Sequence, residues 1–214
     1  MATSMRTGRA TQAGWVATLR ALGIEAPEAD GHWVEIEAAY GAASRHYHTL
    51  GHLEHMFGCL ETVLRDPHPL VSLAVWFHDL VYDPMKQDNE AQSAGAAIRF
   101  GQRFGMTASD LQRLEALILS TKAHEPFEDH PECLALLDAD LAILAAEPER
   151  YDAYARAIRK EYADIPEAQY LPGRAAVLSR FLERPCLYFS PDVQALWDAQ
   201  ARLNLRRELD GLKA

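Results

Sequence analysis

Cysteine is scarce in this chain of 214 residues, which contains only Cys59, Cys133 and Cys186. The three lie far apart, their number is odd, and none stands in a CxxC pair of the kind that zinc ribbons and redox sites use. The pattern argues against a disulfide scaffold and favours the reducing environment of the cytoplasm.

Long apolar runs and basic tracts are also missing. No stretch approaches the roughly 18 apolar residues that span a bilayer, and the N-terminus lacks the apolar segment of a signal peptide. The formal net charge is -10, and cations such as Arg156, Arg159 and Lys160 alternate with acidic residues as they do on a solvated helix face. We therefore expect a small-molecule ligand, with no membrane and no nucleic-acid polymer as partner. The oligomeric state stays open, a homodimer included.

The remaining composition is that of a globular protein, with 49% apolar and 24% charged residues. No repeat or flexible linker divides the chain, so we expect one domain over residues 1–214, with residues 1–10 disordered. Apolar residues recur at helical spacing between Pro and Gly breaks, and nothing indicates a strand. The sequence predicts an all-helical fold of about nine or ten helices. They are expected near residues 15–22, 33–40, 49–64, 70–80, 89–104, 111–121, 132–144, 149–162, 174–182 and 192–209.

Histidines are concentrated in one segment, because His46, His48, His52 and His55 all fall between residues 45 and 55. Residues three or four apart share a helix face, so His48, His52 and His55 would be neighbours within one helix, unless His48 lies in the loop that enters it. A neutral imidazole is a good ligand for a divalent metal. His46 and His55 are interpreted as surface or core-edge histidines.

His78 and Asp79 close the most apolar segment of the chain, since the nine residues before them carry no charge. A buried carboxylate without a partner is costly, whereas a metal ion or a paired cation offsets that cost. Adjacent helical residues point about 100° apart, so either both approach one metal near a helix end or Asp79 bridges two metals. The pair predicts a metal site at the helix exit. The alternative is a hydrogen-bonded His52, His78 and Asp79 group that stabilises a helix crossing without a metal.

Asp138 and Asp140 stand in an otherwise apolar segment, residues 136–144, and the same penalty applies to them. Two positions apart, they project from different faces of a helix. We expect one to face the metal, while the other caps a helix, pairs with an arginine or orients a ligand histidine.

These elements together resemble the HD-domain superfamily of metal-dependent phosphohydrolases, in which a histidine, a His-Asp pair and a final aspartate follow one another along the chain. Within it the chain resembles a bacterial group of uncharacterised predicted HD phosphohydrolases. The resemblance spans about residues 40–184. The segments that carry it are Tyr47-His48 with His52, Trp76 to Asp83, Asn89-Glu90 with Ser93-Ala94, Thr121-Lys122 with His124, and Leu137 to Leu141.

The resemblance implies an HD-type helical bundle and a set of metal ligands. His52, His78 and Asp79 match the first three ligands, and Asp140 fits the family's Ala-Asp-x-Leu pattern better than Asp138, which stays an alternative. The metal is a divalent ion, and this ligand set suits Mn, Fe, Ni, Co, Zn or Mg. Some HD enzymes hold a second ion through extra histidines. Only His124 and His130 lie in the corresponding interval, and only His124 sits in a matching segment.

The activity that the resemblance implies is hydrolysis of a phosphoester of a small molecule, a nucleotide being one candidate, by a metal-activated water. Lys122 or Lys86 would contact the substrate phosphate, and His48 or His124 would act as general acid or substrate contact. Glu90 would orient a water, although it also suits the first turn of a helix.

Two other functions compete with hydrolysis. One is a regulatory or binding module that keeps the metal or only the fold, and the other is a di-iron enzyme that uses oxygen.

The tyrosines of residues 151–162 keep helical spacing and are interpreted as packing.

Overall fold

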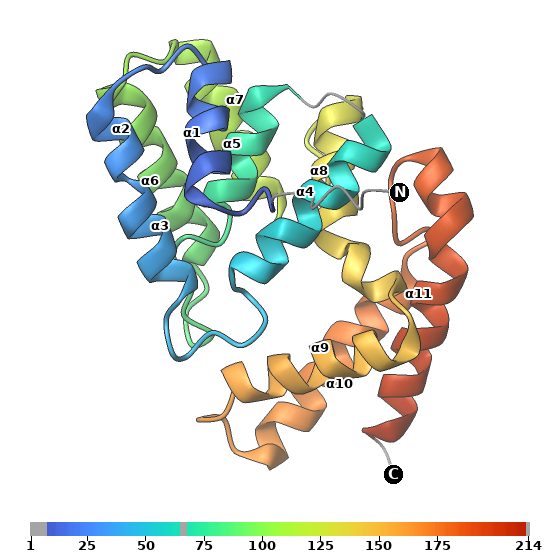
Figure 1. Cartoon of the computed structure of the whole chain (residues 1–214). Coiled ribbons are helices and arrows are strands. Elements are labelled where there is room, and N and C mark those ends of the chain that lie inside the picture. The colour runs from blue at the N-terminus through green and yellow to red at the C-terminus, as the bar shows by residue number, and fades with distance from the viewer. Residues whose placement is uncertain (1–7, 65–67, 213–214) are drawn as a thin grey trace, which may run out of the picture.

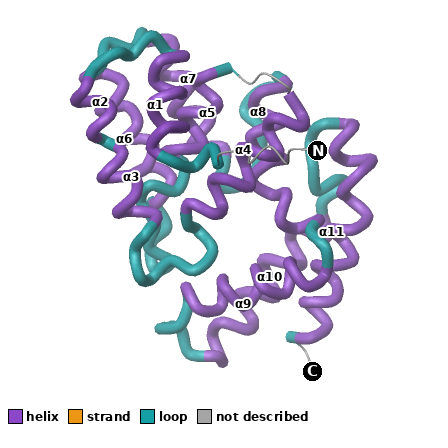
Figure 2. The backbone as a smooth tube through the Cα atoms, in the orientation of Figure 1, coloured by secondary structure: helices purple, strands orange, loops and turns teal. Residues whose placement is uncertain are grey.

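The computed structural model describes residues 8–64 and 68–212, and within these ranges the regular structure is entirely helical (Figure 2). The predicted all-helical fold is confirmed. The expectation of a disordered N-terminus falls mainly on residues 1–7, which lie outside the described residues. Within the described ranges every helix is too short or too polar to cross a membrane. The elements are α1 (Gln12–Ala21), α2 (Pro27–Gly31), α3 (Trp33–Tyr40), α4 (Leu50–Leu64), α5 (Pro69–Phe77), α6 (Asn89–Arg103), α7 (Ala108–Ser120), α8 (Pro131–Asp140), the 3-10 helix η1 (Leu141–Ala145), α9 (Pro148–Glu161), α10 (Glu167–Glu183) and α11 (Pro191–Gly211).

The centre of the first half of the chain is α5, which contacts α1, α4, α6, α7 and α8. Every residue of α5 after Pro69 is buried. Trp76 packs edge-on against Trp15 and Trp33 and donates a hydrogen bond from its indole to Thr18. A helix that is apolar on all sides must be buried on all sides, which explains the central position of α5.

A second apolar cluster lies on the far side of α4 and α8, where η1 and the helices α9, α10 and α11 pack together (Figure 1). Its fully buried members are Tyr151, Leu178, Leu187, Tyr188, Ala201 and Leu205. The two clusters meet where α8 passes into η1, because Ala139 belongs to the first and Leu141 to the second. Residues of both halves therefore surround the end of α8.

Two predicted helices end earlier than expected, and both corrections concern this junction. The helix expected over residues 70–80 ends at Phe77, which makes His78 its C-cap residue. The helix expected over residues 132–144 ends at Asp140, and the chain continues as the tighter η1. A tighter turn at a helix end satisfies carbonyls that have no intrahelical partner. His78, Asp79 and Asp140 thus lie at helix ends, where their side chains are free to converge.

Candidate metal centre

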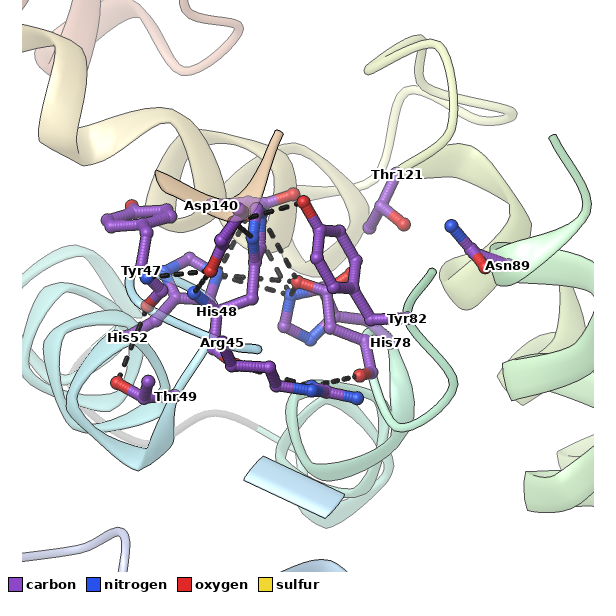
Figure 3. A network of polar contacts seen from close by, with 12 residues as sticks. Arg45, Tyr47, His48, Thr49, His52, His78, Tyr82, Asn89, Thr121 and Asp140 are labelled. Atoms are coloured by element: carbon purple, nitrogen blue, oxygen red, sulfur yellow. Dashed lines mark hydrogen bonds and ion pairs between the residues drawn. The ribbon is translucent and has the colours of Figure 1, made fainter. Parts of the chain in front are cut away.

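Three side chains from distant parts of the sequence meet at the junction of the two apolar clusters (Figure 3). His52 projects from the first turn of α4, His78 from the end of α5 and Asp140 from the end of α8. The His52 Nε2 atom is 3.2 Å from both the His78 Nε2 atom and the Asp140 Oδ1 atom. The Asp79 Oδ2 atom approaches the same point, 3.0 Å from the His78 Nε2 atom and 3.9 Å from the His52 Nε2 atom.

The imidazole of His78 has a fixed orientation. Its Nδ1 atom lies 2.9 Å from the carbonyl oxygen of Val75 and donates a hydrogen bond to it. In the neutral ring the Nε2 atom is then an acceptor that faces the His52 Nε2 atom and the Asp79 carboxylate. The site directs several acceptors at one point, an arrangement that only a proton or a cation between them stabilises.

The spacing of these atoms fits a metal ion. Two ligand atoms that are each about 2.1 Å from one ion lie about 3.0 to 3.4 Å apart in octahedral or tetrahedral geometry. In the group of His52, His78 and Asp140 two separations are 3.2 Å and the third, from the His78 Nε2 atom to the Asp140 Oδ1 atom, is 3.8 Å, and both histidines are buried. Arg45, a buried cation, donates a hydrogen bond to the backbone carbonyl of Asp79. The Asp79 and Asp140 carboxylates have the histidines as their partners instead. Imidazole and carboxylate ligands are the donors that divalent transition metals accept.

The pKa values of His52, His78 and Asp140 are shifted by burial and by the charges that lie close together in this group. Burial lowers the pKa of His78, but the Asp79 carboxylate beside it outweighs burial and raises that pKa to about 9. For His52 burial prevails and its pKa is lowered. Burial raises the pKa of Asp140, yet hydrogen bonds from His124 and His52 hold it well below its usual range. A proton on His78 thus occupies, in part, the place that a cation would take.

His48 lies beside this group, in the loop that leads into α4. Its Nδ1 atom is 2.7 Å from the Glu161 Oε2 atom, and its Nε2 atom is 3.9 Å from the Asp79 Oδ2 atom. The other Glu161 oxygen accepts hydrogen bonds from the backbone N–H groups of His46, Tyr47 and His48. These bonds hold the pKa of Glu161 at about 2, although burial alone would raise it. One buried carboxylate from α9 therefore fixes both the loop and its histidine.

Arg45 anchors the opposite side of that loop. Its guanidinium donates to the backbone carbonyl groups of His48, Asp79 and Leu80 and stacks on the Tyr82 ring. The segment that carries His48 is thereby tied to the segment that carries Asp79.

His124 approaches the group from the loop after α7. Its Nε2 atom is 3.1 Å from the Asp140 Oδ2 atom, while its backbone has a φ of 48°, in the left-handed region that residues other than glycine rarely adopt. Arg184 donates hydrogen bonds to the carbonyl groups of Ala123 and His124 and so fixes this turn. Strained backbone that is held in place by its surroundings is a frequent feature of functional sites.

The two candidate aspartates have different surroundings. Asp138 is fully buried, and its two oxygens accept hydrogen bonds from the backbone N–H groups of Phe189 and Ser190 at the start of α11. Its carboxylate serves as an anchor for α11, whereas Asp140 faces the histidines. The geometry therefore favours Asp140 as the candidate ligand.

A cavity of about 530 Å³ opens beside the group, and most of the other predicted site residues line it. His48, Glu90, Lys122 and His124 are all in its wall together with Asp79 and Asp140. The Lys122 ammonium donates to the carbonyl oxygen of Gln87. Lys86 is not part of this wall and pairs with Asp83 at the surface. His130 caps the start of α8 and lies outside the cavity.

Three residues that position loops of the candidate site were not identified from the sequence: Arg45, Glu161 and Arg184. All three are charged side chains whose main partners are backbone groups far away in the sequence or in a turn. Glu161 follows Arg159 and Lys160 in a charged segment that looks like any solvated helix face. No local pattern distinguishes such residues.

Comparisons with known proteins do not extend this picture, since no family model, curated protein or solved structure matches the chain.

Proposed function

We propose that this chain is a metal-dependent phosphohydrolase of the HD-domain type, with His52, His78, Asp79 and Asp140 as ligands of a divalent ion. The observation that supports it most is the convergence of two imidazole nitrogens and two carboxylate oxygens, with the carboxylates of Asp79 and Asp140 in the wall of a cavity. A metal without an adjoining cavity would be structural, whereas this one would be open to a small ligand.

The bound ion would supply Lewis acidity, which polarises a phosphoryl oxygen and acidifies a water molecule. The protein's own residues would position the substrate around it. Lys122 lies in the cavity wall as the cation for a phosphoryl oxygen, and Glu90 as the acceptor for a water. Their charges fit these roles, since the Arg174 guanidinium, which also lines the wall, is paired with Glu208.

His48 is the candidate for proton transfer. Because Glu161 accepts a hydrogen bond from its Nδ1 atom, the Nε2 atom is the one available to the cavity. A histidine held in this way can give a proton to the oxygen of the leaving group. We expect His48→Gln to lower kcat by about 100-fold to 10,000-fold, the usual contribution of a general acid.

The test is release of inorganic phosphate by the full chain with added Mn²⁺, from para-nitrophenyl phosphate, nucleoside monophosphates and sugar phosphates. The decisive pair of variants is Asp140→Asn and Asp138→Asn, two isosteric changes two residues apart. We expect Asp140→Asn to abolish turnover and Asp138→Asn to retain it, because only the Asp140 carboxylate faces the histidines.

Two outcomes would overturn the proposal. A wild-type protein that holds metal but releases no phosphate from any of these esters would be a binding module. A protein that purifies with iron and turns over only in the presence of oxygen would be an oxidative enzyme.

A further inference from the structure

The cavity has a second end that the chemistry of phosphate transfer does not use. Besides the polar residues already described, its wall is formed by η1, α9 and α10 and by the loop between the last two. The side chains there are almost all apolar or aromatic, and they are Leu141, Ile143, Leu144, Tyr154, Ile158, Tyr162, Ile165, Tyr170, Val177 and Phe181. We call these ten residues the apolar end.

The tyrosines of α9 contribute to this surface in a way that their spacing did not predict. Tyr151 is fully buried and packs in the core, as expected. Tyr154, Ile158 and Tyr162 of the same segment also line the cavity, although Tyr154 packs against the second apolar cluster and Ile158 is buried. Part of the stripe interpreted as packing is therefore a wall that a ligand can contact.

The charged groups near the apolar end are already engaged. The Arg174 guanidinium makes two hydrogen bonds to the Glu208 carboxylate, at 2.7 and 3.0 Å, and lies over the Tyr154 ring. Arg159 stacks on Tyr170 and donates to backbone carbonyl groups. The other polar groups of this wall are Gln169, which is exposed, and the single hydroxyl groups of Tyr154, Tyr162 and Tyr170. A ligand group placed here meets carbon surface and few unpaired donors or acceptors.

We propose that the substrate is a phosphoester whose alcohol part is apolar, an alkyl chain or an unsubstituted ring, and that this part lies against the apolar end. The inference rests on the proposed function, which places the phosphoryl group at the metal. A sugar or nucleoside would have to bury several hydroxyl or amide groups against carbon, which is costly when they find no partner. An apolar group gains free energy from the same burial. The volume is in the range of sites for small organic ligands.

The probe is a series of n-alkylphosphonates from methyl to octyl, which a phosphoesterase cannot hydrolyse. Isothermal titration of the full chain with Mn²⁺ present measures their affinity without relying on turnover. We expect the affinity to rise about twofold to fourfold with each added methylene, as burial of a methylene in an apolar site predicts. In parallel, phosphate release is measured from methyl phosphate, octyl phosphate and adenosine monophosphate.

The matched variants are Val177→Trp and Ala176→Trp on α10. Val177 lines the apolar end, whereas its neighbour Ala176 is exposed and outside the cavity. We expect Val177→Trp to lower the affinity for octylphosphonate at least tenfold and to leave methylphosphonate unchanged. Ala176→Trp should behave as the wild type. The series on the wild-type protein stands without the variants if Val177→Trp does not fold.

The inference and the function on which it rests fail in different ways. An affinity that is flat along the series, or turnover of adenosine monophosphate faster than that of octyl phosphate, overturns the inference while it leaves a phosphohydrolase in place. A rising affinity without phosphate release from any ester supports the apolar end as a binding site and overturns hydrolysis alone.

Discussion

At the scale of single residues, buried polar groups near the site differ in whether they have a hydrogen-bond partner. Tyr40 donates a hydrogen bond from its hydroxyl to the carbonyl oxygen of Trp76. Tyr47 has a buried hydroxyl for which the described residues provide no partner. The two tyrosines offer a direct comparison, since both rings pack beside the same loop.

Removing each hydroxyl tests this difference. We expect Tyr40→Phe to lower the free energy of unfolding by about 1 kcal/mol, because it removes a buried hydrogen bond. Tyr47→Phe should leave stability unchanged or slightly raised, because it removes an unsatisfied polar group. Urea denaturation measures both values. Equal losses in the two variants would show that Tyr47 has a partner in solution.

Glu161 predicts how stability depends on pH. Its pKa is about 2 in the folded chain against a usual value near 4.5, so the unfolded chain binds more protons between these values. The stability that Glu161 contributes is thus present above about pH 4.5 and is lost as the pH falls towards 2. It amounts to about 3 kcal/mol for a shift of this size.

The corresponding variant is Glu161→Gln, measured by urea denaturation from pH 7 to pH 3. We expect it to be less stable than the wild type by about 2 to 3 kcal/mol at pH 7, with a difference that narrows below pH 4.5. The exposed Glu149 of α9 supplies the control, and Glu149→Gln should change stability by less than about 0.5 kcal/mol. A difference between Glu161→Gln and wild type that is independent of pH would contradict the assigned role.

At the scale of helices, the packing of α6 on α7 depends on a glycine. A Cβ atom at Gly101 would lie 2.5 Å from the Leu111 Cδ2 atom and 2.8 Å from the Met106 Sδ atom. A Cβ atom at Gly95, two turns earlier in α6, would meet only the end of the Arg99 side chain at 3.3 Å. The two glycines of one helix thus differ in what surrounds them.

Alanine at each position should shift stability in opposite directions. We expect Gly101→Ala to destabilise the chain by about 1 to 3 kcal/mol, because it overpacks a closed contact. Gly95→Ala should stabilise it by about 0.5 to 1 kcal/mol, because alanine favours the helix. Thermal unfolding followed by circular dichroism distinguishes the two. A stabilising Gly101→Ala would mean that the contact between α6 and α7 is looser than the structure has it.

The helices themselves were largely predictable from the sequence, since apolar periodicity and Pro or Gly breaks are local signals. Two departures have physical reasons. The five-residue α2 is too short to show a period. A break was expected near Pro172, but the helix α10 begins at Glu167 and runs through this proline. The helix continues because the loss of one hydrogen bond in its second turn is tolerated.

The candidate site was predictable only in part. Burial in an uncharged segment marks His78 and Asp140 as residues that need a partner, and their convergence with His52 is confirmed. The residue pattern alone left Asp138 and Asp140 open, and only the family resemblance favoured Asp140. The difference between them depends on where α11 begins, about 50 residues later. Glu161 and Arg45 act on backbone groups of a distant loop, and no local pattern encodes that.

At the scale of the whole molecule, the candidate metal group joins segments that are far apart in the sequence. Residues 52, 78 and 140 come together only in the folded chain. An ion that binds them therefore stabilises the folded state, and a concentration of 100 times its Kd adds about 2.7 kcal/mol. We expect chelator-treated protein to unfold at a lower temperature than the same protein with Mn²⁺ restored. Asp140→Asn should show no such response, and an equal shift in that variant would place the ion elsewhere.

The central claim is that His52, His78 and Asp140 bind a divalent ion, and direct titration of the metal-stripped chain with Mn²⁺ and Zn²⁺ tests it most directly. His52→Gln removes a proposed ligand, and His55→Gln is the control, three residues further along α4 and outside the group. We predict that the wild type and His55→Gln bind an ion with the same affinity and that His52→Gln loses this binding. A folded wild type that binds neither metal, or a His52→Gln variant that binds as tightly, would contradict the account.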